Sequence, residues 1–173
     1  MSFRNAVANW AIVGIVALLC AGCGFQPIYS GRQGAVIQGD LSATKIEVIE
    51  DRTGQLLHNE LLNLINPKGR PQTPKYVLTV TLNETKQELA VKKSAIATRA
   101  NLIFRASFVL KTTLTGSTTL VSGQSRITTS YNILAGEFAT LAAEKDARQR
   151  AVHEIAANIA NRLAAHFQLS GAG

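Results

Sequence analysis

The sequence is poor in cysteine, proline and aromatic residues. Its 173 residues include 2 Cys, 4 Pro and only 6% aromatic side chains. So little proline excludes a collagen-like or low-complexity chain, and the 46% of hydrophobic residues excludes wholesale disorder. Beyond the N-terminus the chain lacks an apolar run of about 20 residues, which excludes a protein with several membrane spans. The length predicts a single domain.

Motifs typical of enzymes and metal sites are also missing. The chain has no G-x-S-x-G motif, no phosphate-binding glycine loop and no dinucleotide fingerprint. Its three histidines, His58, His153 and His166, have no Cys, Asp or Glu at the spacing of a metal site. We therefore expect a protein that is not an enzyme and that uses no metal and no cofactor.

The N-terminus has the layout of an export signal. Arg4 precedes an uncharged apolar stretch that ends in small residues. Its last four residues, Cys20 to Cys23, resemble the bacterial lipobox, in which the final cysteine is acylated after cleavage. We expect a lipoprotein signal peptide over residues 1–22, lipidation of Cys23, and a lipidated N-terminus and linker over residues 23–40. An uncleaved transmembrane anchor is the alternative, because Ala6 to Cys23 just reaches spanning length.

The same residues predict where the mature chain lies. Gly24 stands where lipoproteins kept at the inner membrane often carry Asp, so the lipoprotein sorting rules imply the outer membrane. Triacylation would anchor the chain firmly to one leaflet. Because Cys20 would leave with the signal and Cys23 would carry lipid, no thiol would remain for other chemistry. We expect a lipid-anchored body on the periplasmic face of the outer membrane.

The first part of the body predicts a strand and a helix. Residues 45–49 alternate charged and apolar side chains, as in a half-buried strand. Asp51 is expected to cap the following helix, and the segment Asn66 to Gly69 is expected to end it. The buried stripe of that helix is expected to contain Leu57, Leu61, Leu64 and Ile65.

Three strands and a long helix are predicted to follow. Residues 76–82 and 98–111 alternate with period two, and a third strand is expected from about residue 120 to residue 131. From Glu137 a long amphipathic helix is predicted, with the pairs Glu144–Arg148 and Asp146–Arg150 on its outer, solvated side. Its expected buried stripe is Phe138, Leu141, Val152, Ile155, Ile159, Leu163 and Phe167, widened by alanines at 142, 151, 156, 160 and 164.

These elements predict an α+β fold. The order β-α-β-β-β-α suggests a two-layer sandwich, in which a four-stranded mixed sheet carries both helices on one face. The first two strands would be joined by a right-handed crossover. The domain is expected to span residues 41–169, with residues 170–173 as a flexible tail.

Positive charge is concentrated in the strand region. The chain carries net charge +7, and residues 68–126 alone have ten basic residues against two acidic ones, a net +8. Arg99, Arg105 and Lys111 would form a line of about 40 Å on the uncovered face of the sheet, at ~3.3 Å per residue. Such asymmetry points to an anionic partner, or simply keeps a sheet face solvated. No nucleic acid is expected, because stacking aromatics do not accompany the arginines.

Several stretches resemble the LPS-assembly lipoproteins of the LptE family, of the alphaproteobacterial type. They are Cys23 to Tyr29, Thr98 to Leu102, Ser130 to Leu134 with Phe138 to Leu141 and Glu144 to Ala147, and Ile159 to Ala164. The resemblance implies two helices against a four-stranded sheet, a fold that matches the order predicted above. It also implies a lipoprotein that plugs an LptD-type outer-membrane β-barrel and assists the assembly of lipopolysaccharide into the outer leaflet.

The lipopolysaccharide-binding candidates come from charge and face alone, because the resemblance does not map them one by one. Two other functions stay open: an auxiliary lipoprotein of a lipid or solute transporter, and a structural lipoprotein of the envelope. Proteins that co-purify with the chain separate all three. The candidate residues are Lys92, Lys93, Arg99, Arg105, Lys111 and Arg126.

Overall fold

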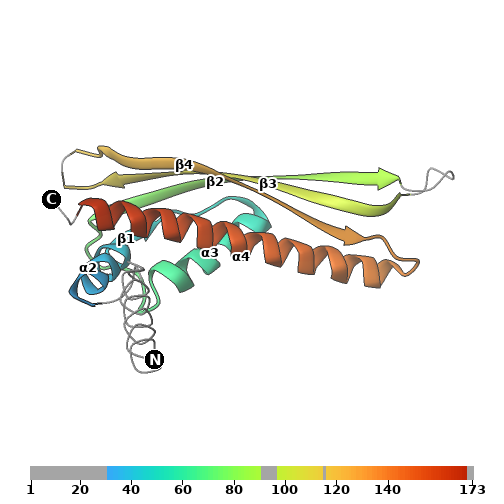
Figure 1. Cartoon of the computed structure of the whole chain (residues 1–173), viewed down its shortest axis with the longest axis horizontal. Coiled ribbons are helices and arrows are strands. Elements are labelled where there is room, and N and C mark those ends of the chain that lie inside the picture. Colours follow the sequence, from blue (N-terminus) through green and yellow to red (C-terminus); the bar gives the residue numbers. More distant parts are fainter. Residues whose placement is uncertain (1–30, 91–96, 115, 171–173) are drawn as a thin grey trace, which may run out of the picture.

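The structure is a computed structural model that describes residues 31–90, 97–114 and 116–170. Its elements follow the order α-β-α-β-β-β-α along the chain, and all of the described helices lie on the same side of the sheet (Figure 1). The elements are α2 (Gly31–Ser42), β1 (Thr44–Ile46), α3 (Asp51–Ile65), β2 (Tyr76–Ala90), β3 (Ala97–Thr112), β4 (Thr119–Asn132) and α4 (Glu137–Ser170). The predicted α+β sandwich with a four-stranded mixed sheet is confirmed.

The sheet runs in the order β1-β2-β3-β4. The short β1 pairs parallel to the start of β2, whereas β2, β3 and β4 pair antiparallel over almost their whole lengths. Gly116 and Ser117, both with positive φ, form the turn between β3 and β4. Residues 99–111 of β3 therefore have a partner on both sides, and β3 forms the centre of the long, narrow part of the sheet (Figure 1).

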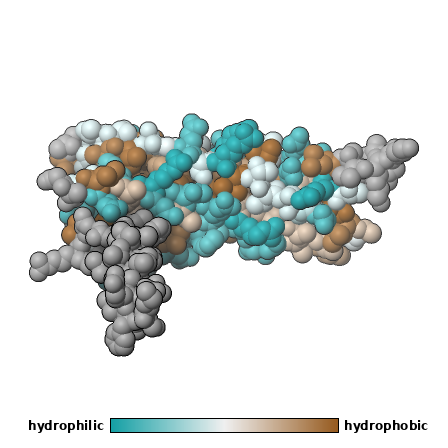
Figure 2. Space-filling model, in the orientation of Figure 1, coloured by the Kyte–Doolittle hydropathy of each residue, from teal (hydrophilic) through white to brown (hydrophobic). Residues whose placement is uncertain are grey.

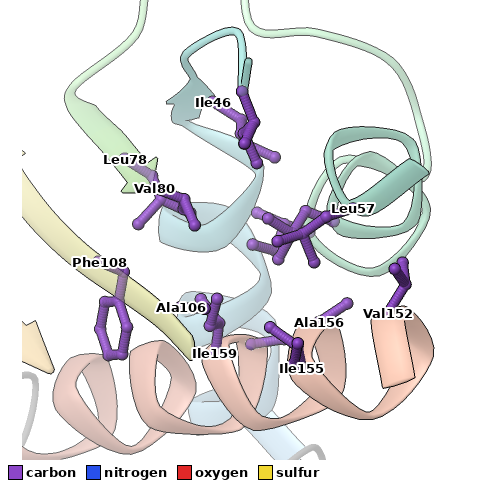
Figure 3. Close-up of a cluster of buried hydrophobic side chains, with 14 of the residues drawn as sticks. Ile46, Leu57, Leu78, Val80, Ala106, Phe108, Val152, Ile155, Ala156 and Ile159 are labelled. Carbon is purple, nitrogen blue, oxygen red and sulfur yellow. The ribbon is translucent and has the colours of Figure 1, made fainter. Parts of the chain in front are cut away.

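The hydrophobic core lies between the sheet and the helices. Even-numbered residues of β3 point into it, and Phe104 and Phe108 are almost completely buried. Figure 3 shows this core where Ile46, Leu78 and Val80 meet Leu57 of α3 and Ile155 of α4. Other buried members are Ala100, Leu102, Ala106, Leu110, Leu61, Ile65, Ala151, Ile159, Leu163 and Phe167.

A helix occupies part of the segment expected to be a linker. Residues 31–42 form α2, and its Ile37 and Leu41 are 1% and 2% exposed. The boundary expected at residue 41 therefore lies inside a packed helix. The sequence did not predict this helix, because its three glycines and mixed polarity give it little helix propensity. Its stability comes instead from the core contacts of Ile37 and Leu41.

The start of α3 also differs from the prediction. The first strand ends at Ile46, and Glu50, not Asp51, is the N-cap residue. Asp51 lies within the first turn with a φ of 68° and its helix has no side-chain cap hydrogen bond, so the expected Asp51 cap is wrong. Leu64 is 38% exposed and is not part of the buried stripe.

The end of α3 is held as the sequence predicts. Asn66 is the C-cap residue, and its side-chain Nδ2 donates to the carbonyl oxygens of Ser42 and Thr44 at 3.1 and 3.2 Å. This one amide ties the end of α3 to the end of α2 and the start of β1. At the other end of the chain, Ser170 is the last residue of α4 rather than part of a tail, and residues 171–173 lie outside the described residues.

Candidate functional site

The face of the sheet opposite the helices carries the predicted line of cations. Arg99 and Arg105 are exposed and Lys111 is half-buried, while their even-numbered neighbours on β3 are buried under the helices. The alternation predicted for this strand is thus confirmed, and with it the placement of these three residues. We call this surface the open face; it consists of the odd-numbered residues of β2 and β3 and the even-numbered residues of β4.

Two arginines lie directly opposite each other in the middle of the open face. Arg105 on β3 is the cross-strand partner of Arg126 on β4, and Asn83 is the partner of Arg105 on β2. No carboxylate of the described residues forms an ion pair with either arginine. Like charges directly opposite on neighbouring strands destabilise a sheet, so this pair favours an anion bound between the two guanidinium groups.

Other polar groups lie further along the open face, toward the two ends of β3. Arg99 donates from Nη2 to Ser130 Oγ at 2.9 Å, which orients its guanidinium along the face. Lys45 of β1 is exposed and pairs in register with Val77, so it adds a cation that was not among the candidates predicted from the sequence. The register alone identifies it, because its charge pattern within residues 45–49 indicated only a half-buried strand.

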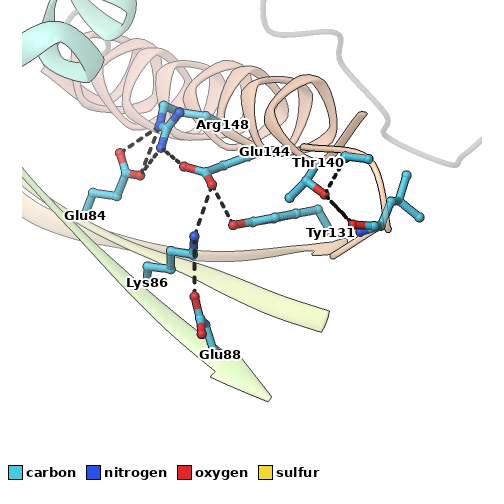
Figure 4. Close-up of polar contacts among 9 residues, drawn as sticks. Glu84, Lys86, Glu88, Tyr131, Thr140, Glu144 and Arg148 are labelled. Atoms are coloured by element: carbon cyan, nitrogen blue, oxygen red, sulfur yellow. Dashed lines mark hydrogen bonds and ion pairs between the residues drawn. The ribbon is translucent and has the colours of Figure 1, made fainter. Parts of the chain in front are cut away.

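A second polar cluster lies on the other side of the sheet, between β2, β4 and α4 (Figure 4). Arg148 donates to Glu84 Oε1 and to Glu144 Oε1, both at 2.8 Å, and Lys86 Nζ lies 3.2 Å from Glu144 Oε2. The Tyr131 hydroxyl donates to Glu144 Oε2 at 2.7 Å. The predicted pair Glu144–Arg148 therefore exists but faces the sheet, so its expected outer, solvated position is wrong.

This cluster shifts the pKa values of its members. The hydrogen bond from Tyr131, with those from Arg148 and Lys86, lowers the pKa of Glu144 from 4.5 to about 2. The pKa of Lys86 is raised by Tyr131 and Glu144, and the pKa of Arg148 is raised by its hydrogen bonds to Glu84 and Glu144. Since both cations have carboxylate partners, the cluster joins α4 to the sheet and offers no free charge to a ligand.

The beginning of α4 exposes apolar side chains. Phe138 and Leu141, which were predicted to lie in the buried stripe, are 88% and 62% exposed, and Leu134 before the helix is 50% exposed. Burial in α4 starts only at Ala147, because the strands opposite its first turns present Lys86 and Glu84 instead of core residues. In Figure 2, hydrophobic atoms appear at the end of the molecule where α4 begins.

Grooves flank this exposed helix start. Leu141 lines a hollow of about 480 Å³ beside the loop that precedes α4, together with Leu134 and Thr140. It also lines a groove of about 770 Å³ between α3 and α4, together with Leu56 and Lys145. An exposed apolar residue between two hollows, here Leu141, is typical of a surface that contacts another protein.

The histidines serve the fold. His58 Nδ1 lies 3.0 Å from the carbonyl oxygen of Glu47, His153 Nδ1 lies 2.7 Å from Glu60 Oε1, and the His166 ring contacts Phe167. Among the residues that the structure describes, no three His, Cys, Asp or Glu side chains are grouped to hold a metal ion. Within the same residues, no helix has both the length and the apolarity needed to cross a bilayer.

Three of the predicted site residues cannot be located in the fold. Cys23, Lys92 and Lys93 lie outside the described residues, as do the signal peptide and the Cys23 to Tyr29 stretch. The strands bring together the other four candidates, Arg99, Arg105, Lys111 and Arg126, on the open face.

Two solved structures that are similar to this fold are bacterial lipoproteins. A candidate lipoprotein from Caulobacter crescentus CB15 is 26% identical, with a TM-score of 0.63 over 77% of this chain and 96% of that one. A minor lipoprotein from Acinetobacter baumannii is 17% identical, with a TM-score of 0.53 over 70% of this chain and 90% of that one. No family model and no curated protein matches the sequence. The comparisons support the coarser expectation, a lipid-anchored lipoprotein of the bacterial envelope.

Proposed function

We propose that the protein is an outer-membrane lipoprotein that plugs an LptD-type β-barrel and assists it in assembling lipopolysaccharide into the outer leaflet. The observation that carries the proposal is the pair Arg105–Arg126 on the open face, two guanidinium groups side by side without a carboxylate partner among the described residues. Phosphorylated glycolipid is the anion available at an outer membrane. The family resemblance of the sequence supports the same assignment.

The chemistry of the open face suits lipid phosphates. A guanidinium forms two parallel hydrogen bonds to a phosphate, and charge-assisted bonds of this kind are stronger than neutral ones. Arg105 and Arg126 can therefore take the place of a divalent ion that bridges two phosphates of neighbouring lipopolysaccharide molecules. Arg99 and Lys111, six residues to either side of Arg105 on the same strand, extend the positive line along the sheet.

The apolar start of α4 supports the protein partner. Three apolar side chains at this helix start are exposed in the isolated chain: Phe138, Leu141 and Leu134. Inside the barrel they would bury this apolar surface against the barrel wall. The triacylated Cys23 would hold the domain at the inner leaflet. The proposal gives the protein a role in binding and positioning, with no catalytic step, no cofactor and no nucleic acid.

The test combines a purification with a charge reversal. A C-terminally tagged chain is purified from outer membranes in detergent, and the associated proteins and lipopolysaccharide are quantified. We expect a large β-barrel at one-to-one stoichiometry. The double variant Arg105→Glu with Arg126→Glu should keep the barrel and lose most of the lipopolysaccharide.

A matched variant controls for net charge. Lys68→Glu with Arg70→Glu makes the same charge change at exposed positions of the loop that follows α3, and it should retain both the barrel and lipopolysaccharide. Recovery of transporter subunits, or of no stoichiometric protein, would contradict the barrel partnership. Equal lipopolysaccharide recovery with both double variants would contradict the role of the open face.

A further inference from the structure

The outer edge of β4 turns a row of backbone groups away from the sheet. The backbone N–H of Ile133 donates to the carbonyl oxygen of Thr98 at 3.0 Å, which fixes the phase of the β3–β4 ladder. In an antiparallel pair, alternate residues direct both N–H and C=O to the partner strand. The odd-numbered residues of β4 therefore bond to β3, and the N–H and C=O groups of the even-numbered residues point outward: Ser122, Gln124, Arg126, Thr128 and Ser130.

This edge lacks the usual protection against pairing with another strand. β4 is 14 residues long and contains no proline, no carboxylate and a single charged residue, Arg126. No described backbone group outside the sheet bonds to its outward N–H or C=O groups between Ser122 and Ser130. A long edge of this kind, rich in β-branched and hydroxyl side chains, is a template for strand addition.

The opposite edge of the sheet is protected. The first residues of β2 pair with β1, and Thr53 of α3 donates to Glu84 further along. By the same alternation, the outward residues in the second half of β2 include Glu84, Lys86 and Glu88, which are charged. Charged residues at an edge discourage pairing. The contrast indicates that β4 is the edge left available.

The charges near the β4 edge select the kind of strand that can bind there. A second copy of this chain would bring its own Arg126 and its own line of cations to the same edge. A strand with a carboxylate opposite Arg126 would instead neutralise that guanidinium and relieve its repulsion with Arg105. Charge complementarity thus favours an acidic strand over self-association.

We propose that the β4 edge binds an extended acidic segment of a partner protein by antiparallel strand addition, with a carboxylate of that segment opposite Arg126. Backbone hydrogen bonds from the outward groups of β4 supply the affinity, and the arginine supplies the selectivity. Strand addition goes beyond lipopolysaccharide binding, because it uses outward backbone groups of β4 that lipid phosphates do not need. Arg126 belongs to both surfaces, whereas the backbone groups belong to the strand-addition edge alone.

The direct test measures binding of a synthetic strand to the full chain in detergent by fluorescence anisotropy. The probe is a labelled nine-residue peptide of alternating Val and Thr with Glu at two of the Thr positions. Its controls carry Lys instead of Glu, or N-methyl groups on alternate amides. We expect the Glu peptide to bind, the Lys peptide to bind about fivefold or more weakly, and the N-methylated peptide not to bind.

Variants at the edge separate strand addition from binding through side chains. Thr128→Pro removes one outward N–H without breaking the β3–β4 ladder, and should weaken the Glu peptide about tenfold. Thr128→Val keeps the N–H, and its affinity for the Glu peptide should lie within about twofold of that of the parent chain. Gln124→Pro repeats the test at a second position if the first proline variant does not fold.

Three outcomes would overturn the inference. They are failure of the Glu peptide to bind the parent chain, unchanged binding by a folded proline variant, and a dimer of this chain that Thr128→Pro abolishes. Lipopolysaccharide binding should persist in Thr128→Pro, so a failure of strand addition can be told from a failure of the proposed function.

Discussion

Arg105 and Arg126 are direct cross-strand partners in the centre of the open face, and neither forms an ion pair with a carboxylate of the described residues. By contrast, Lys86 and Arg148 on the helical side of the sheet both form ion pairs with Glu144, and Arg148 forms a second one with Glu84. The same sheet therefore uses charge in two ways. On the helical side, paired charges join the sheet to α4. On the open face, unpaired arginines leave a site for an anion.

Removing one arginine of the pair should stabilise the isolated domain. Arg126→Gln ends the repulsion with Arg105, and we expect the free energy of unfolding to rise by ~0.5 kcal/mol at low salt. The gain should shrink at high salt, because exposed charges are screened. Urea unfolding at two salt concentrations measures both effects. A loss of stability at low salt would show that the arginine makes a favourable contact that the fold requires.

Acid should weaken the polar cluster through Glu144. The pKa of this carboxyl is lowered from 4.5 to about 2 by its bonds to Tyr131, Arg148 and Lys86, so its contribution to stability is complete above pH 4.5. The contribution, about 2–3 kcal/mol, should disappear as the pH falls from 4.5 to 2. The difference in unfolding free energy between the parent chain and Glu144→Gln should narrow over this range. A difference that stays constant over this range would contradict the lowered pKa of Glu144 and its contribution to stability.

Gly123 provides a test of packing between β4 and the core. A Cβ atom at this position would lie 2.8 Å from the Phe108 ring and 2.9 Å from Arg162 Nη1. Gly123→Ala should therefore destabilise the fold by ~1–3 kcal/mol through overpacking. Gly39→Ala is the control: no atom lies within 4 Å of its new Cβ, and alanine in a helix should add ~0.5–1 kcal/mol. Thermal unfolding of both variants measures these two changes in stability, which we expect to have opposite signs.

The helix α2 should be part of the folded domain. Leu41→Ala removes a side chain that is 2% exposed, and we expect a loss of ~2–5 kcal/mol in unfolding free energy. Val36→Ala on the same helix, where 57% of the residue is exposed, should change stability by less than ~0.5 kcal/mol. If both variants unfolded alike under urea, α2 would be a loosely attached segment.

The exposed start of α4 should matter to a partner and not to the fold. Phe138 is 88% exposed, so Phe138→Ser should leave the unfolding free energy within ~0.5 kcal/mol. It should nevertheless reduce the amount of barrel that co-purifies with the chain. The control is Leu169→Ser near the other end of the helix, also 80% exposed, which should retain the barrel. Equal barrel recovery with the two variants would argue against a contact through Phe138.

The fold could be predicted from the sequence wherever one periodic pattern controlled burial. The alternation along β3 places Phe104 and Arg105 on opposite faces, and the stripe from Val152 to Phe167 is buried as expected. The helical pattern gave a wrong prediction where an apolar residue of α4 has no core residue of the sheet opposite it. Phe138 and Leu141 continue the helical stripe in sequence, but the core ends before it reaches them.

The candidate site was predicted only in part, for a physical reason. Composition and alternation place Arg99, Arg105 and Lys111 on one face, because all three belong to one strand. The pairing of Arg105 with Arg126 depends on the register between two strands, and that register includes a bulge between Leu110 and Lys111. Local sequence does not specify such a register, and the network around Glu144 likewise depends on distant elements.

Photo-cross-linking in living cells can detect a contact between the open face and lipopolysaccharide. A photoreactive amino acid at Ser107, an exposed position on β3 two residues from Arg105, is compared with one at Gln149, an exposed position on α4. We predict cross-linked lipopolysaccharide at Ser107 and little at Gln149. Equal labelling at both positions, or none at Ser107 when the barrel co-purifies, would contradict the account.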